Sequence, residues 1–424
     1  MSQAPDHPRD PLAWNLAIAL AFLAVAAIRL TIPSKPFFDE VHYVPAARTL
    51  LALSHPVNVE HPLLGKELIG LGISLFGDNP LGWRIMPLLF GTLGLFAAMR
   101  ALWFAAGSRF ASIAGGILLA TDFLWFVMSR IAMLDGIMAS LVLVSLWAFA
   151  GALRENETGR RRLSMTGVAL GLAMAAKWNA VPIAVLPGLA FAVVRLRETG
   201  WRALTAGRGA PVAGITIWEA ALWLGAVPLT VYSLTFAPAM FYAHEPLAPG
   251  GLVALHREMI QLQDSVVKPH PYQSIWYQWV VNWRAIWFLY EPIDGAQRGI
   301  LLLGNPLTML LGLVALIWAG VHGFTESRRD AAALVVLYVA SMSMWIIADK
   351  PVQFYYHYLL PGTFLIGMIA LALDAMWREG RRAIPLIVLA ASATLFAGFY
   401  PILSAARLEG PQSFAHWMWL DSWR

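Results

Sequence analysis

Long apolar segments recur from one end of this chain to the other, and they limit its fold more than any other feature. The first runs from Leu12 to Ile32, close to the ~20 residues that an α-helix needs to cross a bilayer. Only 13% of the 424 residues are charged, against about 25% in a soluble domain. The sequence therefore predicts an all-α integral membrane protein and excludes a soluble one.

We expect about eleven membrane-spanning helices from the apolar runs and the breakers between them. Their predicted ranges are 12–32, 82–104, 109–124, 133–152, 163–177, 180–195, 212–236, 299–320, 331–348, 355–376 and 383–403. The fifth and sixth meet at Lys177-Trp178-Asn179, so their common boundary is the least defined. The first segment has no small-residue cleavage site and no basic region before it, which favours a retained helix over a signal peptide.

The arginines indicate how the chain is oriented. They gather in alternate short loops, all on one side of the membrane if the N-terminus is cytoplasmic. These arginines are Arg109, Arg154, Arg160, Arg161, Arg162, Arg195, Arg197, Arg202, Arg208, Arg328, Arg329, Arg378, Arg381 and Arg382. The net charge of +5 is therefore a topology signal and does not indicate a nucleic-acid partner. Two long loops, about 33–81 and 237–298, then lie outside, with turns near 130–135, 177–179 and 348–357.

The first external loop concentrates residues able to do chemistry. Asp39 and Glu40 follow the first segment, and a partly buried carboxylate there can take a proton from a hydroxyl because burial raises its pKa. Taken alone, a solvated pair of acids is the commoner interpretation. His61 and Lys66 open a short interfacial helix, where they either bind phosphate or act as a cap and an interfacial cation. Arg84, at the outer end of the second segment, needs an anionic partner, either an acid or a lipid phosphate.

Further polar and aromatic residues lie on the same predicted side. Arg130 and Asp135 are five positions apart, which does not favour an ion pair within one helix, so we expect each to find a partner elsewhere. Lys177 interrupts an apolar run and is expected to face a polar cavity. Aromatic residues in 270–279 and 353–358 either form an interfacial belt or contact sugar and lipid.

These motifs occur in an order that resembles the bacterial dolichyl/polyprenyl-phosphate-mannose–protein O-mannosyltransferases, within the GT-C class of membrane glycosyltransferases. The match spans roughly residues 35–365 and rests on eight motifs. They are Phe38-Asp39-Glu40-Val41-His42-Tyr43, His61-Pro62 through Gly65-Lys66, Trp83-Arg84, Ser129-Arg130 through Leu134-Asp135, Ala176-Lys177-Trp178-Asn179, Tyr272 through Trp279, Gly304-Asn305-Pro306 and Tyr356-His357-Tyr358. The chain departs from the family at Leu63, where a proline is usual, and at Trp279-Val280, where Trp-Pro is usual.

The resemblance implies one GT-C domain over residues 1–424, with two large external loops carrying short interfacial helices and no soluble C-terminal domain. It implies a bacterial plasma (inner) membrane location with the active site on the periplasmic face. The implied reaction is an inverting transfer of mannose from polyprenyl-phosphate-mannose to Ser or Thr of exported proteins. Asp39 matches the catalytic base, Glu40 its partner in the acceptor site, and Asp135 a second acid.

Other positions match residues expected to hold the donor. Arg84, with Lys66, His61 and Arg130 as further candidates, is expected to bind the donor phosphate and stabilise the leaving group. Sugar or lipid contacts are expected from Lys177, Trp178, Tyr272, Trp276, Tyr356 and His357.

Two alternatives for the activity and one for a cofactor remain open. The same chemistry could serve a lipid or envelope-glycan acceptor. A lipid or sugar-lipid transporter fits less well, because the polarity is one-sided and no internal repeat is present. No cofactor is expected, and a divalent cation at Asp39, His42, Glu60 and His61 is the alternative. The chain has no cysteine, which excludes disulfides, thiolate metal sites and a cysteine nucleophile.

Overall fold

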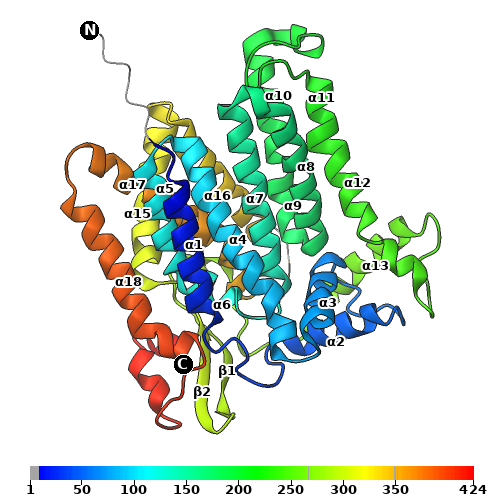
Figure 1. Cartoon of the computed structure of the whole chain (residues 1–424), viewed down its shortest axis with the longest axis vertical. Helices are drawn as coiled ribbons and strands as arrows, with labels where there is room; N and C mark the ends of the chain where they lie inside the picture. The colour runs from blue at the N-terminus through cyan, green and yellow to red at the C-terminus, as the bar shows by residue number, and fades with distance from the viewer. Residues whose placement is uncertain (1–8, 266, 348–349, 351) are drawn as a thin grey trace.

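Helices make up most of the computed structural model, which describes residues 9–265, 267–347, 350 and 352–424 (Figure 1). The α-helices are α1 Leu12–Ala27, α2 Glu40–Leu51, α3 Leu64–Phe76, α4 Pro80–Ala106, α5 Arg109–Ala120, α6 Phe123–Met128, α7 Leu134–Arg154, α8 Gly159–Ala176, α9 Val181–Ala184, α10 Leu186–Thr199, α11 Ile217–Ala221, α12 Val227–Leu234, α13 Leu252–Asp264, α14 Trp276–Val280, α15 Pro306–Thr325, α16 Arg329–Ile347, α17 Leu359–Arg378 and α18 Ala383–Leu403. The strands are β1 Ile286–Ile293 and β2 Ala296–Leu302. Two short 3-10 helices matter for the site, η2 Trp178–Ala180 and η6 Tyr355–Tyr358.

The predicted class, an all-α membrane bundle, is confirmed, although the count of eleven spans is not. Every predicted range contains helix, but among the described residues eight helical stretches are long and apolar enough to cross a membrane. These are 80–106, 134–154, 178–204, 217–241, 306–325, 329–347, 355–378 and 383–403. The apolar helices α1 and α5 are shorter. Position 348, the predicted end of one span, lies outside the described residues.

The two central helices of the bundle are α7 and α17. Of the most apolar 18-residue window in each, 67% is buried in α7 and 83% in the stretch containing α17, against 22–50% in the other spans. Small residues such as Gly136 in α7 permit this close packing, because a side chain there would collide with the Met128 backbone. A polar side chain on the buried part of α7 or α17, such as Asp135, therefore has protein around it.

An antiparallel β-hairpin, β1–β2, stands where the sequence predicts the end of a loop and the start of a span at 299. The predicted start is wrong, since α15 begins at Pro306, after Asn305 caps its first turn. Asp294 and Gly295 both have positive φ, 50° and 73°, the backbone that a two-residue hairpin turn requires. The Asp294-Gly295 pair between two apolar runs is a hairpin signal. The sequence prediction missed it because the second run was counted as the start of a membrane span.

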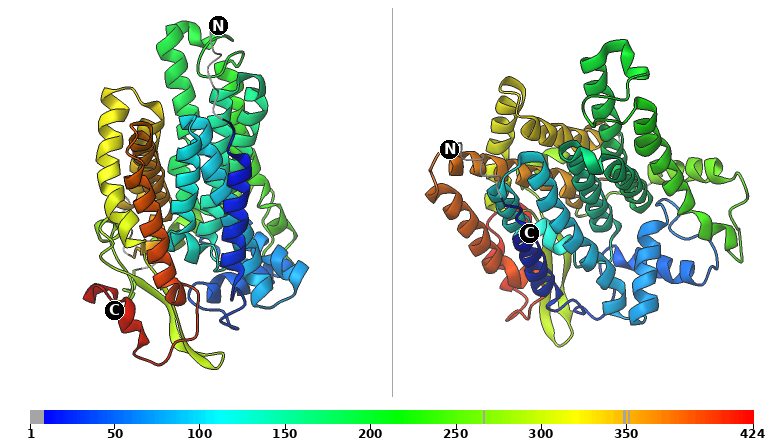
Figure 2. Two further views of the ribbon diagram at one scale, coloured as in Figure 1. Left: turned by 60° about the vertical axis from the view of Figure 1, so that its left-hand side comes forward. Right: turned by 45° about the horizontal axis from the view of Figure 1, so that its top comes forward.

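The long connecting segments gather at one end of the bundle. Figures 1 and 2 place α2, α3, α13 and the β-hairpin at the end opposite the start of α1. The two loops expected to face the same side of the membrane do lie at the same end. The break between the fifth and sixth predicted spans falls at Lys177, whose backbone is extended (φ −163°, ψ 142°) between α8 and η2. This break brings Lys177 to the same end.

Candidate active site

Glu40 and Arg84 form an ion pair that is sealed inside the protein. Arg84 Nε lies 2.8 Å from Glu40 Oε1, and the two side chains are 1% and 0% exposed. A guanidinium has five N–H groups, and here two are donated to Glu40 and three to backbone carbonyls. The Glu40 carboxylate also accepts two backbone N–H groups. The backbone partners are the carbonyls of Leu30, Pro33 and Lys35 and the N–H groups of Phe37 and Ala132.

This saturation changes the roles expected for Glu40 and Arg84. Neither side chain has a donor or acceptor left for a ligand, and neither is accessible. Arg84 is therefore placed to hold the chain that leads from α1 to α2, and the expectation that it binds the donor phosphate does not fit this geometry. Glu40 likewise does not reach an acceptor, because its carboxylate is turned to Arg84.

Lys66 is saturated in a similar way. Its ammonium group donates to the carbonyls of Val57, Asn58 and His61 at 3.4, 2.7 and 2.9 Å, and an ammonium has three N–H groups to give. The residue is 1% exposed, and burial lowers its pKa to about 7. Lys66 thus closes the turn before α3, and its expected phosphate contact does not fit the geometry either.

Asp39 is directed away from Glu40 by a strained turn. Phe38, the residue before it, has φ 48°, a left-handed backbone that few non-glycine residues adopt. The Phe38 ring stacks on Phe288 of β1 at 4.0 Å and meets Tyr356 edge-on at 6.1 Å between centroids. Contacts from β1 and η6 therefore hold this conformation in place. Asp39 remains half-buried where Glu40 is fully buried.

Asp135 and Lys177 form a second buried ion pair, and this one is unsaturated. Lys177 Nζ lies 2.7 Å from Asp135 Oδ2, and the side chains are 6% and 1% exposed. Among the described residues, Asp135 Oδ1 is buried without a hydrogen-bond partner, and Lys177 makes no other hydrogen bond. The ammonium lies 5.2 Å from the centre of the Tyr356 ring. Both groups keep capacity for a ligand.

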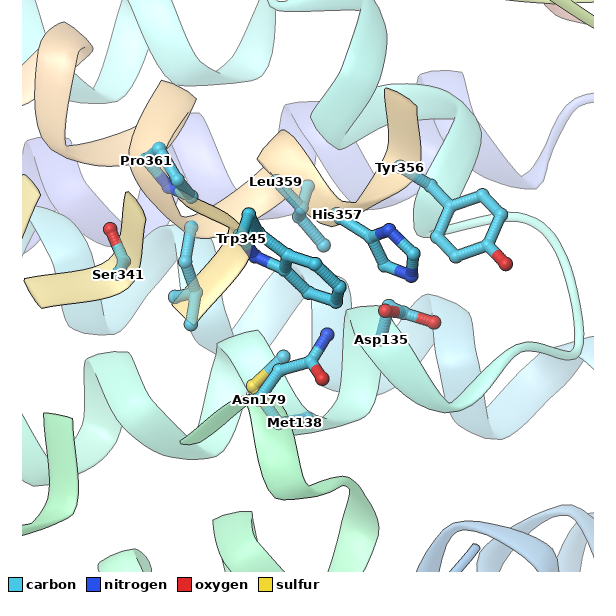
Figure 3. A pocket seen from close by; sticks show the side chains of 10 residues that line it. Asp135, Met138, Asn179, Ser341, Trp345, Tyr356, His357, Leu359 and Pro361 are labelled. Carbon is cyan, nitrogen blue, oxygen red and sulfur yellow. The ribbon is translucent and has the colours of Figure 1, made fainter. Parts of the chain in front are cut away.

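A narrow cavity of about 10 Å³, little more than the space of one water molecule, opens beside Asp135 of this pair (Figure 3). Its walls include Asp135, Asn179 from η2, Trp345 from α16, and Tyr356 and His357 from η6. His357 stacks on Trp345 at 3.8 Å between ring centroids. Aromatic walls with a few polar groups aimed inward are typical of small-molecule sites. The cavity therefore belongs to the same site as the Asp135–Lys177 pair.

Asp39 shares the electrostatic environment of this pair. Burial raises the pKa of Asp39 to about 6, while the positive charge of Lys177 opposes the rise and the negative charge of Asp135 adds to it. The Tyr356 hydroxyl also faces the carboxyl and stabilises its charged form. A carboxylate of this pKa is mostly ionised at neutral pH and is more basic than a solvated acid, which suits a general base.

Several other predicted residues lie apart from the cavity. Arg130 donates to the carbonyls of Ala26 and Ile28 at the end of α1, so it and Asp135 do find separate partners, as predicted. Trp178 Nε1 donates to the Tyr232 hydroxyl at 2.9 Å. The residues Tyr272 and Trp276 do not line the cavity either.

The alternative divalent-cation site is not assembled. Among the described residues, no three His, Asp or Glu side chains lie close enough together to hold a metal ion. The His42 side chain is exposed, while Glu60 accepts a hydrogen bond from Asn58 at 2.6 Å. Asp39, His42, Glu60 and His61 therefore do not form the ligand set that the sequence left open.

The sequence reasoning missed two residues near the site, Lys350 and Gln263. Lys350 Nζ donates to Gln263 Oε1 at 2.8 Å, and Gln263 Nε2 lies 2.9 Å from the Glu60 carbonyl and 3.3 Å from His61 Nδ1. A lysine in the short external turn 348–357 was an available signal, although 348, 349 and 351 lie outside the described residues. Nothing in the sequence distinguishes Gln263 from the other polar residues of its loop.

Two family models match most of the chain. Residues 60–217 match the model described as dolichyl-phosphate-mannose-protein mannosyltransferase, and residues 250–423 match the C-terminal four TMM region of protein-O-mannosyltransferase. Two bacterial relatives carry the name polyprenol-phosphate-mannose–protein mannosyltransferase. The Mycobacterium tuberculosis protein is 28% identical, covering 96% of this chain and 90% of its own length. The Corynebacterium glutamicum protein is 27% identical, with 98% and 94% covered.

Solved structures extend the likeness to the fold. The yeast protein O-mannosyltransferase Pmt1–Pmt2 complex bound to the sugar donor contains a chain that superposes with a TM-score of 0.76. It is 14% identical, and the match covers 100% of this chain and 96% of that one. ArnT from Cupriavidus metallidurans, bound to undecaprenyl phosphate, gives a TM-score of 0.55 at 17% identity, covering 92% and 64%. At these identities the likeness establishes the GT-C fold alone.

Proposed function

The chain belongs to the protein O-mannosyltransferase family of membrane glycosyltransferases, and from this membership we propose that it moves mannose from a polyprenyl-phosphate donor to Ser or Thr hydroxyls of exported proteins. It is a multi-pass membrane mannosyltransferase. The near full-length match to relatives named for polyprenol-phosphate-mannose and for protein supports this donor and this acceptor.

In the proposed reaction, Asp39 is the general base. Asp39 takes the proton of the acceptor hydroxyl while the hydroxyl oxygen bonds to C1 of mannose. The bond between C1 and the phosphate oxygen breaks, and polyprenyl phosphate leaves with the electron pair. Attack from the face opposite the phosphate inverts C1, so a β-linked donor gives an α-linked product.

One contrast supports this proposal. The charges of Glu40, Arg84 and Lys66 are fully hydrogen-bonded within the protein, whereas the charges around Asp39 are not. Asp39 has a pKa raised to about 6 and lies next to a buried Asp135–Lys177 pair with unused hydrogen-bonding capacity. Unpaired buried polar atoms are costly, so their presence beside a cavity supports a ligand that completes them. Lys177 supplies positive charge for the departing phosphate, and Asp135 Oδ1 with His357 contacts the sugar.

We propose that the transfer needs no metal ion. Lysine ammonium groups near the leaving phosphate can neutralise its charge, since a phosphate monoester is already a competent leaving group. Full activity in the presence of a strong chelator is the expected result. Loss of activity that is restored by one added divalent cation would overturn this part of the proposal.

The proposed location is a bacterial inner membrane, with a cytoplasmic N-terminus and the site on the periplasmic face. The absence of cysteines makes this testable, because a single introduced thiol is unique. Exposed His42, changed to Cys, should react with a membrane-impermeant maleimide added to intact spheroplasts, whereas exposed Arg161 changed to Cys should not. The reverse labelling pattern would invert the proposed topology.

The decisive test of function is transfer itself. Membranes containing the wild-type protein or Asp39→Asn are incubated with polyprenyl-phosphate-[³H]mannose, and the labelled products are separated. Label on Ser or Thr of protein, present with wild type and absent with the variant, is the expected result. Label found on a lipid or glycan instead would change the acceptor, and label independent of Asp39 would remove the proposed base.

A further inference from the structure

The saturated cations leave the donor phosphate with few partners. All five N–H groups of Arg84 and all three of Lys66 are donated within the protein, as described above. Lys177 donates one N–H to Asp135. Its single positive charge neutralises only part of the charge of a dianionic leaving group. A second cation with uncommitted donors is therefore expected on the same side of the cavity.

Lys350 meets that requirement. Its described hydrogen bond is the one from Nζ to Gln263 Oε1, at 2.8 Å, so one of its three N–H groups is committed in this way. Its charge acts on His61, His357 and Asp135, and its pKa is lowered to about 8 by burial and then by Lys177. The side chain is half-buried. Lys350 is therefore joined through Gln263 to His61, and it lies within electrostatic reach of Lys177 and Asp135.

The amide of Gln263 can take only one orientation here. Its Oε1 accepts from the Lys350 ammonium, while its Nε2 donates to the Glu60 carbonyl at 2.9 Å and meets His61 Nδ1 at 3.3 Å. The flipped amide would set its NH₂ against the ammonium and its oxygen against the carbonyl, so it would lose the contacts to Lys350 and to Glu60 and could keep only the one to His61. His61 Nδ1 must then be the acceptor nitrogen. That agrees with the pKa of His61, which burial holds well below its usual range.

We propose that Gln263 is a positioning residue that holds Lys350 as the second phosphate-binding cation, in addition to Lys177, for the lipid-phosphate donor. The proposal rests on the proposed function, which supplies the phosphate. It assigns a role to α13, on the second external loop, that neither its sequence nor its amphipathic pattern indicates.

The anchoring of α13 supports this role. At its other end, His256 Nδ1 donates to the Leu252 carbonyl at 2.7 Å, so His256 Nε2 accepts from the Tyr232 hydroxyl at 2.6 Å. That hydroxyl in turn accepts from Trp178 Nε1. The helix is thus fixed to α12 and η2 at one end and to the turn before α3 at the other. Such two-point anchoring positions Gln263 more closely than a loop residue would be.

The test uses the full-length protein in lipid nanodiscs and measures binding of polyprenyl phosphate and, separately, of uncharged polyprenol. Gln263→Glu keeps the shape, loses both donations from Nε2 and pairs its carboxylate with Lys350, which neutralises the cation. We expect polyprenyl phosphate affinity to fall about 10- to 100-fold, the size of one or two charge-assisted contacts, with polyprenol binding unchanged. Lys350→Met should give a similar fall and Lys350→Arg a smaller one. Gln261→Glu adds the same charge at an exposed position of the same helix, and it should bind like wild type.

The double variant Lys350→Met/Gln263→Met, which adds no charge, decides whether Gln263 acts through Lys350. If it does, the double variant binds polyprenyl phosphate no more weakly than Lys350→Met alone. Additive losses, an equal loss of polyprenol binding, or wild-type affinity in Lys350→Met would each overturn the proposal. If the wild-type protein bound polyprenyl phosphate but transferred no mannose, the proposed function would be wrong. The proposed phosphate site would not be affected by that result.

Discussion

Two charged clusters, one around Glu40 and the other around its neighbour Asp39, differ in how completely their hydrogen bonds are satisfied within the protein. Around Glu40 and Arg84, every N–H of the guanidinium and both carboxylate oxygens are hydrogen-bonded inside the protein. Around Asp39, the Asp135–Lys177 pair is as deeply buried, yet a carboxylate oxygen lacks a partner among the described residues. Folding alone accounts for the first cluster. The second cluster keeps an unsatisfied hydrogen-bond acceptor, which a substrate can satisfy.

Saturation therefore separates structural charge from functional charge where residue type does not. Breaking a buried ion pair is strongly destabilising, because it leaves one charge without compensation. Both clusters should be sensitive to single substitutions for that reason. The two clusters should differ when both charges of the pair are removed, a change that leaves no buried charge unpaired and so restores the fold. Activity should return with the fold only in the cluster whose role is structural.

The largest effect is expected from Asp39→Asn. Loss of a general base typically lowers a rate by about 10²- to 10⁴-fold, and the amide cannot take up the proton. Single-turnover transfer from polyprenyl-phosphate-mannose measures the effect, with donor binding as the control, which should stay within a few-fold of wild type. A variant that still transfers within tenfold of wild type would place the base elsewhere.

Arg84→Met should be nearly as damaging, but through the fold. Removing the guanidinium strands the Glu40 charge and should cost about 3–5 kcal/mol of stability, measured as a fall in the unfolding midpoint and in the yield of folded protein. The double variant Arg84→Met/Glu40→Gln removes both charges and should recover part of the stability and, with it, part of the activity. Recovery of the fold without any recovery of transfer would mean that this cluster takes part in chemistry.

Lys177→Met/Asp135→Asn is the matching double variant for the other cluster. Removing both charges should leave the fold close to wild type in its unfolding midpoint, since no buried charge is stranded. Transfer should nevertheless fall about 10- to 100-fold, the worth of a charge-assisted contact to the donor phosphate. Wild-type kcat/KM in a folded double variant would make the two clusters equivalent and end the distinction.

The sequence allowed three features to be predicted: the membrane class, the common side of the polar loops, and the concentration of candidate site residues in the first external loop. These follow from apolar length, charge bias and local motif. The residues alone did not allow Asp39 to be told from Glu40, and only the family resemblance gave the two acids different expected roles. The difference arises from the left-handed backbone at Phe38, which rings from β1 and η6 stabilise far along the chain. The saturation of Arg84 depends equally on backbone carbonyls, which carry no sequence signature.

The pH dependence of transfer and of stability should report the ionisation of Asp39, with a smaller effect than the substitutions above. The proposed base, Asp39, has to be deprotonated to accept a proton, so with a pKa of about 6 the rate of transfer should fall roughly tenfold from pH 7 to pH 5. Stability should change in the opposite direction. Because burial raises this pKa above the value of about 4 of an unfolded chain, the folded state binds the extra proton and gains stability as pH falls from about 6 to 4.

Asp39→Asn provides the control for that profile. The variant has no carboxyl to titrate, so its unfolding midpoint should lose the part of the pH dependence that lies between about 4 and 6. A wild-type rate that is flat from pH 7 to pH 5 would mean that the ionisation of Asp39 does not limit transfer.

The smallest effect is expected from an ion pair of the same loop that belongs to neither cluster. Arg48 Nε lies 2.8 Å from Asp78 Oδ2, but the side chains are 43% and 46% exposed. Exposed pairs contribute about 0–1 kcal/mol, since water already solvates both charges. Arg48→Ala should therefore lower stability by no more than about 1 kcal/mol and leave transfer unchanged, as measured in the same unfolding and single-turnover assays. If Arg48→Ala instead cost as much as Arg84→Met, saturation by buried partners would not be what distinguishes the charges of this loop.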